Sequence, residues 1–160
     1  VADLLREVGA DMEALSRDKG VALAMRLDVP AVVRGNEGLL RRLFLNLVDN
    51  AVRYTPEGGK VSIASDTAGD EALVSVSDTG IGIPPEHLPH IFERFYRVDK
   101  ARSRSDGGSG LGLAICKQVV DLHGGRIEVD SKEGQGSTFK VFVPLLRKAD
   151  MAQSSPSRGS

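Results

Sequence analysis

Apolar side chains recur at helical spacing in three stretches of this sequence. The pattern predicts helices over residues 2–18, 36–54 and 111–122. Asn36 can cap the second helix through its side-chain oxygen. Gly20 follows the first helix, Pro56 the second and Gly124 the third, and residues of these two types favour the end of a helix. The sequence therefore predicts three helices with clear breaks between them.

Alternation of apolar and polar side chains marks the strands. It predicts strands over residues 21–27, 61–64, 72–77, 126–130 and 137–143. The last two form a hairpin around Gly134-Gln135-Gly136, and a short helix is expected at residues 87–92 after Pro84-Pro85. Residues 97–110 show no periodicity and are rich in glycine, serine and charge, so we expect a mobile loop there. Helices and mostly antiparallel strands that segregate in this way predict a two-layer α+β sandwich.

The composition supports one soluble domain. Hydrophobic residues make up 41% of the 160 residues and charged residues 27%, which allows a core within a charged surface. We expect the domain to span residues 1–146 and the polar stretch 147–160 to be a disordered tail. The net charge of -1 argues against nucleic-acid or membrane-surface binding, because no basic excess is available to neutralise phosphates. The single cysteine, Cys116, fits a reducing compartment and a buried position in a helix.

Two asparagines stand on one side of the second predicted helix. At about 100° per residue, the apolar side chains cluster on another side, which should pack on the sheet: Leu40, Leu43, Phe44, Leu47 and Ala51. Asn46, Asn50 and Arg53 form a polar stripe beside them, and Tyr54 lies at the seam. A solvated polar face explains this stripe, and so does a site in which an amide oxygen holds Mg²⁺ while Arg53 meets phosphate oxygens. The helix alone does not decide between the two.

A carboxylate and two glycines follow the third predicted strand. Asp78 ends an apolar strand, and Gly80 and Gly82 permit a tight turn with close approach of a ligand. A carboxylate that faces an apolar pocket needs a hydrogen-bond donor. The exocyclic amine of adenine is such a donor, whereas guanine presents an acceptor at the same edge, so Asp78 would select ATP over GTP. An ordinary Asp-Thr-Gly turn is the alternative.

A second glycine run leads directly into the third predicted helix. Free N–H groups at a helix start, with small residues that allow close approach, bind phosphate oxygens. The run Gly108-Ser109-Gly110-Leu111-Gly112 has this form, although no Gly-Lys-Ser/Thr follows as in a Walker A loop. Four cations upstream can reach the same phosphates or remain solvated: Arg97, Lys100, Arg102 and Arg104. Leu111, Leu113 and Ile115 also fit the core of the fold.

Five short motifs occur along the chain in this order: Asn46-x-x-x-Asn50-Ala-x-Arg53-Tyr54-Thr55, Asp78-Thr-Gly-Ile-Gly-Ile, Phe92-Glu-Arg-Phe-Tyr-Arg97, Gly108-x-Gly-Leu-Gly-Leu-Ala and Gly134-x-Gly136-Ser-Thr-Phe139. Together they resemble the asparagine, glycine and phenylalanine boxes of the catalytic, ATP-binding domain of sensor histidine kinases. The resemblance covers residues 1–146. It implies the Bergerat ATP-binding fold, with helices on one face of a mixed, mostly antiparallel sheet. It also implies ATP and Mg²⁺ as cofactors, and transfer of the γ-phosphoryl group to a histidine in two-component signal transduction.

The resemblance assigns roles to the residues at matching positions. Asn50 would ligate Mg²⁺, Asn46 would support phosphate or metal, and Arg53 would contact phosphate in a place often held by lysine. Tyr54 would contact the nucleoside, and Asp78 would bind the adenine. The remaining ATP-binding residues would shape the base pocket, line the phosphates or lie beside the base: Gly80, Gly82, Ile83, Gly108, Gly110, Leu111, Gly112, Leu113 and Thr138.

The phosphoacceptor of this family has no match in the chain. It is a histidine followed by an acidic residue and an Arg-Thr-Pro-like run on a dimerising helix hairpin. His87, His90 and His123 fit packing or capping better than a His-x-x-His metal pair, which needs further ligands. Because the chain begins with Val1 rather than methionine, we expect a fragment whose acceptor hairpin lies on a missing N-terminal part.

The partners follow from the same resemblance. It implies a monomeric fragment of a homodimeric parent, whose partners are the dimerisation and histidine-phosphotransfer domain and a downstream response regulator. No apolar run reaches the about 20 residues needed to span a bilayer. The resemblance implies a cytoplasmic location, as the cytoplasmic portion of a membrane-anchored sensor.

Position 46 separates the relatives within the superfamily. Gyrase-type and chaperone ATPases carry a glutamate four residues before the metal-binding asparagine, and this glutamate activates water. Asn46 cannot take a proton, so we expect slow ATP hydrolysis and kinase activity only with an acceptor hairpin. Two alternatives stay open. The first is a degenerate nucleotide-binding regulatory module without phosphotransfer. The second is a serine-directed kinase of the same superfamily, although such kinases resemble the glutamate-bearing pattern and this chain has Asn46.

Overall fold

The structure, a computed structural model, describes residues 1–27, 31–96 and 112–146. In chain order the elements are α1 (Ala2–Lys19), β1 (Ala22–Arg26), α2 (Glu37–Arg53), β2 (Lys60–Ala68), β3 (Glu71–Asp78), a 3-10 helix (Leu88–His90), α4 (Gly112–Leu122), β4 (Arg126–Lys132) and β5 (Gly136–Pro144). The mobile loop expected at residues 97–110 and the tail expected at residues 147–160 lie outside the described residues.

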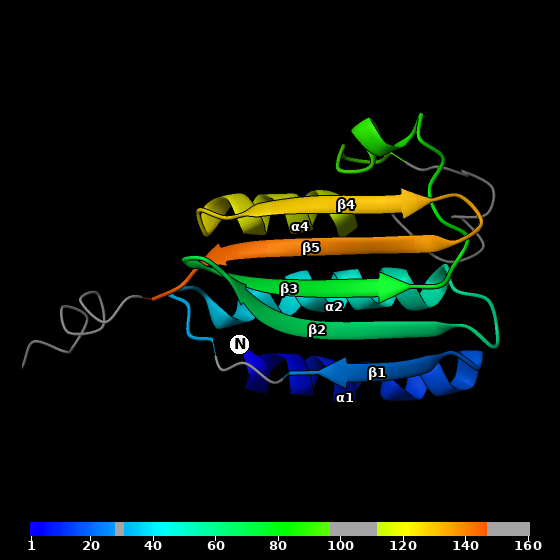
Figure 1. The fold of residues 1–160 in the computed structure, drawn as a ribbon, viewed down its shortest axis with the longest axis horizontal. Helices are drawn as coiled ribbons and strands as arrows, with labels where there is room; N and C mark the ends of the chain where they lie inside the picture. The colour runs from blue at the N-terminus through cyan, green and yellow to red at the C-terminus, as the bar shows by residue number, and fades with distance from the viewer. Residues whose placement is uncertain (28–30, 97–111, 147–160) are drawn as a thin grey trace, which may run out of the picture.

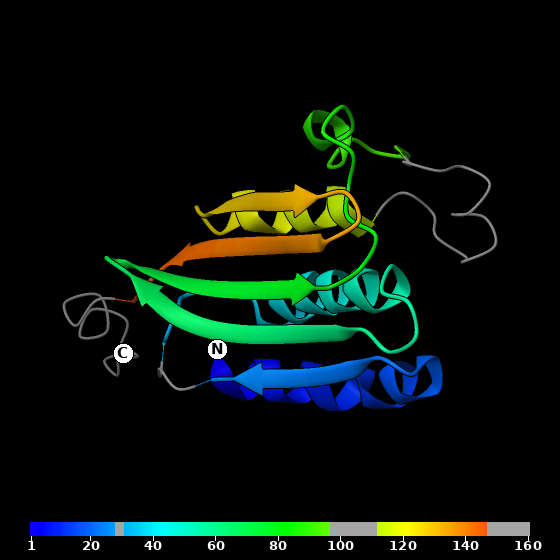
Figure 2. The same cartoon turned by 45° about the vertical axis from the view of Figure 1, so that its right-hand side comes forward.

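The described strands form one sheet in the order β1-β2-β3-β5-β4. β1 runs parallel to β2, and the other three neighbouring pairs are antiparallel. The three α-helices of the described chain lie against the same face of this sheet (Figure 1), and the turned view in Figure 2 separates the two layers. The predicted two-layer α+β sandwich with a mixed, mostly antiparallel sheet is therefore confirmed.

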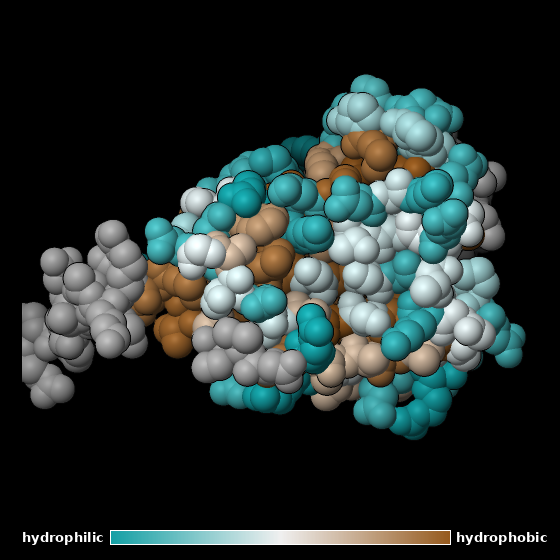
Figure 3. Space-filling model, in the orientation of Figure 1, coloured by the Kyte–Doolittle hydropathy of each residue, from teal (hydrophilic) through white to brown (hydrophobic). Residues whose placement is uncertain are grey.

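The core lies between the two layers. Most helix-facing positions of the central strands are apolar and buried: Val61, Ile63, Val74, Val76, Phe139 and Val141. The apolar side of α2 predicted from its wheel is buried against them: Leu40, Leu43, Phe44, Leu47 and Ala51. Figure 3 views the sheet from its helix-free side, where hydrophilic and near-neutral residues cover most of the strands. The hydrophobic effect thus fixes which face of α2 turns inward, and the polar stripe of α2 is left beside that face.

The ends of the helices follow the predicted signals. Gly20 adopts the left-handed conformation after α1, with φ of 76°. The Asn36 side chain accepts a hydrogen bond from the Leu39 N–H at 2.9 Å and caps α2. Among the described residues, no helix combines the length and the apolar character that crossing a membrane requires.

β2 and the short helix after Pro85 differ most from the sequence prediction. β2 continues to Ala68, four residues past the predicted end, and pairs with β3 throughout. Ser65 occupies a buried, helix-facing position in this extension, and because serine is polar the apolar alternation breaks there. Its hydroxyl has no hydrogen-bond partner among the described residues. The short helix expected at 87–92 is a single 3-10 turn, Leu88–His90, with Pro89 inside it.

Candidate functional site

The C-terminal ends of α2 and β3 meet at one end of the sheet. The Ile81 N–H, three residues after β3, donates to the Tyr54 carbonyl oxygen at the end of α2 (3.2 Å). Gly80 allows this contact, because a Cβ atom at that position would lie 2.3 Å from the Tyr54 carbonyl oxygen. The chain that carries Asp78 is therefore joined directly to the helix end that carries Arg53 and Tyr54.

Asp78 is a half-buried carboxylate held by backbone donors. One of its oxygens, Oδ1, accepts from the Gly80 N–H at 2.8 Å and from the Ser137 N–H at 3.2 Å. Burial raises the pKa of Asp78, and these two hydrogen bonds oppose the rise. Within the described part of the chain its other oxygen has no hydrogen bond. The geometry thus orients the carboxylate and leaves one oxygen able to accept from a ligand.

The turn after Asp78 packs tightly on the β4–β5 hairpin. Gly82 has φ of 72°, and a Cβ atom there would lie 2.2 Å from the Lys132 carbonyl oxygen. The Gly134 N–H donates to the Ile81 carbonyl oxygen at 2.7 Å. These contacts require glycine at position 82, both for its backbone conformation and for the close approach of the two chains.

Two serines that the sequence analysis did not single out complete this contact. The Ile83 N–H donates to Ser131 Oγ at 2.7 Å, and Ser131 Oγ lies 2.7 Å from Ser137 Oγ. Ser137 also supplies the N–H that reaches Asp78. Ser137 stands inside the Gly134-x-Gly136-Ser-Thr motif and could have been noticed, whereas no local pattern distinguishes Ser131.

Thr138 is not brought to the Asp78 carboxylate. In the β3–β5 register Asp78 pairs with Ser137 and Val76 with Phe139, and Phe139 faces the helices in the core. Side chains alternate along a strand, so Thr138 points to the opposite face of the sheet. There its hydroxyl lies 3.0 Å from Ser77 Oγ. The structure therefore places Ser137 beside the carboxylate. That Thr138 lies beside the base stays a prediction.

The polar stripe of α2 faces the start of α4. Asn46 Nδ2 lies 3.5 Å from the Gly112 carbonyl oxygen, a long and weak hydrogen bond. Asn50, one turn further on, is half-buried, and its side chain has no hydrogen bond to the described residues. The amide of Asn50 is therefore available to a ligand in a polar strip between two helices and the end of the sheet.

Arg53 and Cys116 are held by their own neighbours. Arg53 Nε donates to Asp49 Oδ2 at 2.8 Å, one helical turn away, and the two side chains are 39% and 36% exposed. Cys116 is buried in α4, and its thiol contacts the Leu43 carbonyl oxygen at 3.6 Å. Burial raises the pKa of Cys116 to about 12, so this thiol is a packing group and not a nucleophile.

The second glycine run is only partly covered by the structure. Gly108, Gly110 and Leu111 lie outside the described residues, as do the four predicted loop cations. Gly112 opens α4, and Leu113 is half-buried against the core. Among the described residues, no three His, Cys, Asp or Glu side chains gather closely enough to hold a metal ion. A metal ion at the stripe would therefore take amide, water or substrate oxygens, as Mg²⁺ does.

The three histidines serve packing and capping contacts. The Asn36 N–H donates to His123 Nε2 at 3.0 Å, while His123 Nδ1 lies 2.7 Å from the Val119 carbonyl oxygen. His87 contacts the Tyr96 hydroxyl, and His90 Nδ1 lies 2.5 Å from a Glu93 carboxylate oxygen. In the same segment Phe92 packs edge-on against Phe139, with ring centroids 6.3 Å apart. This segment thus rests on β5 next to the residues around Asp78.

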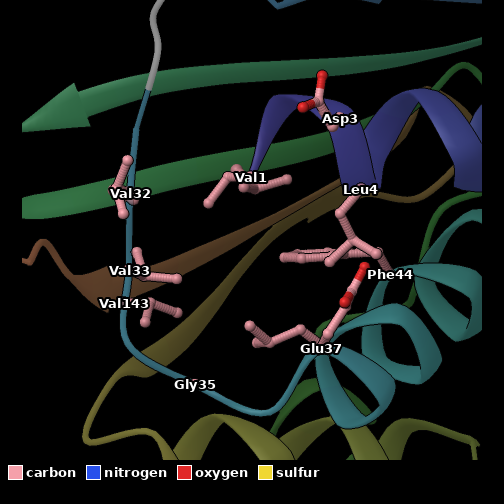
Figure 4. A pocket seen from close by; sticks show the side chains of 12 residues that line it. Val1, Asp3, Leu4, Val32, Val33, Gly35, Glu37, Phe44 and Val143 are labelled. Carbon is pink, nitrogen blue, oxygen red and sulfur yellow. The ribbon is translucent and has the colours of Figure 1, made fainter. Parts of the chain in front are cut away.

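A cavity of about 240 Å³ lies at the other end of the sandwich. Figure 4 shows it between the start of α1, the segment before α2 and the first turns of α2. Its lining is largely apolar, with two carboxylates at Asp3 and Glu37 and no lysine or arginine among the lining residues. None of its lining residues belongs to the polar stripe of α2 or to the chain around Asp78. The cavity is therefore separate from the groups at Asp78 and Asn50.

Comparison with known proteins identifies similar sequences. Residues 35–147 match the family described as "Histidine kinase-, DNA gyrase B-, and HSP90-like ATPase". The "Sensor-like histidine kinase SenX3" of Mycobacterium tuberculosis is 48% identical over 143 residues, which are 86% of this chain and 35% of that protein. The "Phosphate regulon sensor protein PhoR" of Pseudomonas aeruginosa is 41% identical over 153 residues, 96% of this chain and 34% of that protein. The chain thus spans about a third of the length of these curated relatives.

Solved structures agree with the sequence matches. The catalytic domain of histidine kinase ThkA has a TM-score of 0.78 at 31% identity and covers 90% of this chain and 91% of its own. Full-length ShkA, solved in complex with AMPPNP, has a TM-score of 0.78 at 34% identity over 90% of this chain and 30% of that one. ThkA in complex with the response regulator protein TrrA has a TM-score of 0.74 at 29% identity over 90% of this chain and 40% of that one.

Proposed function

This chain belongs to the histidine kinase-, DNA gyrase B- and HSP90-like ATPase family, as an ATP-binding catalytic domain of the sensor histidine kinase type, and we propose how its residues work. In this proposal residues 1–146 form the domain. It binds ATP at the Asp78 end of the sheet and delivers the γ-phosphoryl group to a histidine on a dimerisation domain of the parent protein.

The observation that carries the proposal is the half-buried Asp78 with one oxygen fixed and one available. The available oxygen of Asp78 can accept a hydrogen bond from the exocyclic amine of adenine. Guanine presents an acceptor at the same edge, so two acceptors would face each other without a hydrogen bond. Gly80, Gly82 and Ile83 shape the pocket around the base, and Ser131 and Ser137 hold them there. The Tyr54 carbonyl oxygen lies next to Gly80, and in this proposal the Tyr54 side chain contacts the nucleoside.

The phosphates and the metal ion belong, in this proposal, to the stripe of α2 and the start of α4. The Asn50 amide oxygen, without a hydrogen bond to the described residues, fits a hard cation, and Asn46 supports the phosphates or the metal. Mg²⁺ bound there neutralises charge on the phosphates during transfer. Arg53 adds a positive charge one turn from Asn50, where Asp49 orients its guanidinium. By the resemblance, the second glycine run would border the phosphates: Gly108, Gly110, Leu111, Gly112 and Leu113.

In this proposal the described residues around Asn50 supply orientation and charge, and position 46 supplies no general base. Asn46 stands where water-activating relatives of the superfamily carry glutamate, and an amide cannot accept a proton. An imidazole nitrogen of the acceptor is already a nucleophile, so transfer requires in-line placement and exclusion of water. ATP hydrolysis without an acceptor is therefore slow.

The partners of the parent protein are also part of the proposal. We propose a homodimeric parent that has a histidine-bearing dimerisation domain and lies on the cytoplasmic side of a membrane anchor. Its downstream partner would be a response regulator, because the similar protein ThkA forms a complex with one. No observation favours the alternative of a degenerate nucleotide-binding module.

Phosphohistidine formation tests the proposal. The chain is mixed with the separately produced dimerisation domain of the parent, Mg²⁺ and labelled ATP. We expect acid-labile, alkali-stable label on the acceptor domain with the wild type, and a loss of at least about a hundredfold with Asn50→Ala. Gln118→Ala, on the exposed side of α4, serves as the matched control. ATP binding without label on the acceptor would instead support the degenerate module.

A further inference from the structure

The last turn of α2 ends with carbonyl groups that the helix itself cannot pair. An α-helix leaves its final four carbonyl oxygens without intrahelical donors. Three of them receive donors from the residues just after the helix: Asn50 O from Tyr54 N at 3.2 Å, Ala51 O from Thr55 Oγ1 at 2.7 Å and Val52 O from Thr55 N at 3.3 Å. The Arg53 carbonyl oxygen receives none of these.

Lys19 supplies the missing donor from another helix. Its ammonium group, at the end of α1, donates to the Val52 carbonyl oxygen at 2.9 Å and also to the Arg53 carbonyl oxygen. These contacts join residues 33 and 34 positions apart in the sequence. The Lys19 side chain is half-buried at this junction, so the two hydrogen bonds are shielded from water on one side.

Two backbone hydrogen bonds just after Lys19 fix the end of α1. The Gly58 N–H donates to the Gly20 carbonyl oxygen at 2.8 Å, and the Ala22 N–H donates to the Gly59 carbonyl oxygen at 3.0 Å. The end of α1 is thereby joined to the loop that follows α2. Lys19 thus reaches α2 from a backbone segment that is itself hydrogen-bonded to that loop.

We infer that Lys19 is a positioning residue for nucleotide binding. By donating to the last carbonyl oxygens of α2, it holds Arg53 and Tyr54 in the orientation that binds the ligand. The inference rests on the proposed function. On the opposite side of the same turn, the Tyr54 carbonyl oxygen accepts from the Ile81 N–H. Lys19 and Ile81 therefore hold the turn between α1 and the base pocket, and Lys19 touches no ligand itself.

The charge of Lys19 has a second effect at this place. The C-terminus of a helix carries a partial negative charge, which repels a polyanion such as ATP. A cation bonded to the last carbonyl oxygens offsets that charge. Lys19 is hydrogen-bonded to the carbonyl oxygen of Arg53, the residue proposed to contact phosphate. Removal of Lys19 would therefore loosen Arg53 and leave the partial negative charge of the helix end without a neighbouring cation.

A double-mutant cycle on ATP affinity tests the inference. Lys19→Met keeps the length of the side chain and removes its donors and charge. With a non-hydrolysable ATP analogue and Mg²⁺, measured by calorimetry, we expect Lys19→Met to bind about tenfold more weakly than the wild type. In an Arg53→Ala background the same change should cost about threefold, because the contribution through the Arg53 side chain is gone and only the effects on Tyr54 and on the helix end remain. Lys19→Arg, which retains charge and donors, should restore affinity to within about threefold of the wild type.

The control and the contrary results are distinct. Lys117→Met removes an equal charge from an exposed pair with Asp121 on α4 and should bind as the wild type does. Thermal unfolding verifies that each variant is folded at the assay temperature. If Lys19→Met is unfolded at that temperature, Lys19→Gln is used in its place. Wild-type affinity in Lys19→Met, or an equal loss in both backgrounds, would overturn the inference. Absence of ATP binding by the wild type would overturn the proposed function and the inference with it.

Discussion

Replacement of Asp78 by asparagine separates recognition of the base from folding of the pocket. The amide oxygen of the new side chain can take the place of Oδ1 and accept from the Gly80 and Ser137 N–H groups, at 2.8 and 3.2 Å in the wild type. The amide nitrogen then occupies the place of the oxygen that is available to a ligand. A donor would thus face the adenine amine, which is also a donor.

The magnitude follows from that exchange. The variant loses a hydrogen bond to a charged acceptor and gains an unpaired donor in a half-buried place, at a cost of about 2 kcal/mol or more, roughly thirtyfold in ATP affinity. Guanine presents an acceptor at the same edge, so the preference for ATP over GTP should narrow. Calorimetry with both nucleotides measures the two effects, and Asp66→Asn, on an exposed part of β2, is the matched control.

The pH dependence of stability gives an independent check on the same residue. Burial raises the pKa of Asp78 against the opposing hydrogen bonds from Gly80 and Ser137, so the folded chain holds this proton more tightly than the unfolded chain. The ionised carboxylate therefore lowers stability at neutral pH, and this loss disappears as the pH falls through the raised pKa. Asp78→Asn should equal or exceed the wild type in unfolding free energy at neutral pH, with a difference that shrinks on acidification.

Two results would refute this reasoning. Equal ATP affinity in the wild type and Asp78→Asn would remove Asp78 from base recognition. A variant that is less stable than the wild type at neutral pH by more than about 1 kcal/mol in urea unfolding would show that Oδ1 is not replaced by the amide oxygen.

Two further substitutions and one proteolysis experiment test other parts of the site. Gly80→Ala puts a Cβ atom 2.3 Å from the Tyr54 carbonyl oxygen, so urea unfolding should show a loss of about 1–3 kcal/mol, and unchanged stability would contradict the close approach. Asn46→Glu supplies a base and should raise ATP hydrolysis at least tenfold, on the order of one general-base contribution; phosphate release at the wild-type rate would remove support for the argument. An ATP analogue with Mg²⁺ should slow proteolytic cleavage within residues 97–110, and equal cleavage rates with and without it count against contact between that segment and the nucleotide.

The fold was largely predictable because its signals are local. Gly20, Asn36 and Gly124 mark helix ends through backbone conformation and capping, which neighbouring residues determine. The apolar side of α2 followed from spacing alone. The end of β2 was missed because a buried serine, Ser65, interrupts the alternation and is tolerated only in the context of the whole sheet.

The site was predictable only in part, because its contacts join distant segments. Asp78 and Gly82 stood out through residue type and motif. The contacts of Ser131 with the turn after β3, and of Lys19 with α2, join residues 48 and 33 positions apart and have no local signature. Thr138 was assigned a place beside the base from resemblance, and this stays a prediction. The alternation of β5 around the apolar Phe139 puts Ser137 on the helix-facing side, next to Asp78.

A crystal structure of the chain with a non-hydrolysable ATP analogue and Mg²⁺ tests the central claim most directly. The account predicts the adenine amine within hydrogen-bond distance of Asp78 and the metal ion on the Asn50 amide oxygen, in one bound nucleotide. A nucleotide that contacts neither residue, or that occupies the cavity beside Asp3 and Glu37, would contradict it.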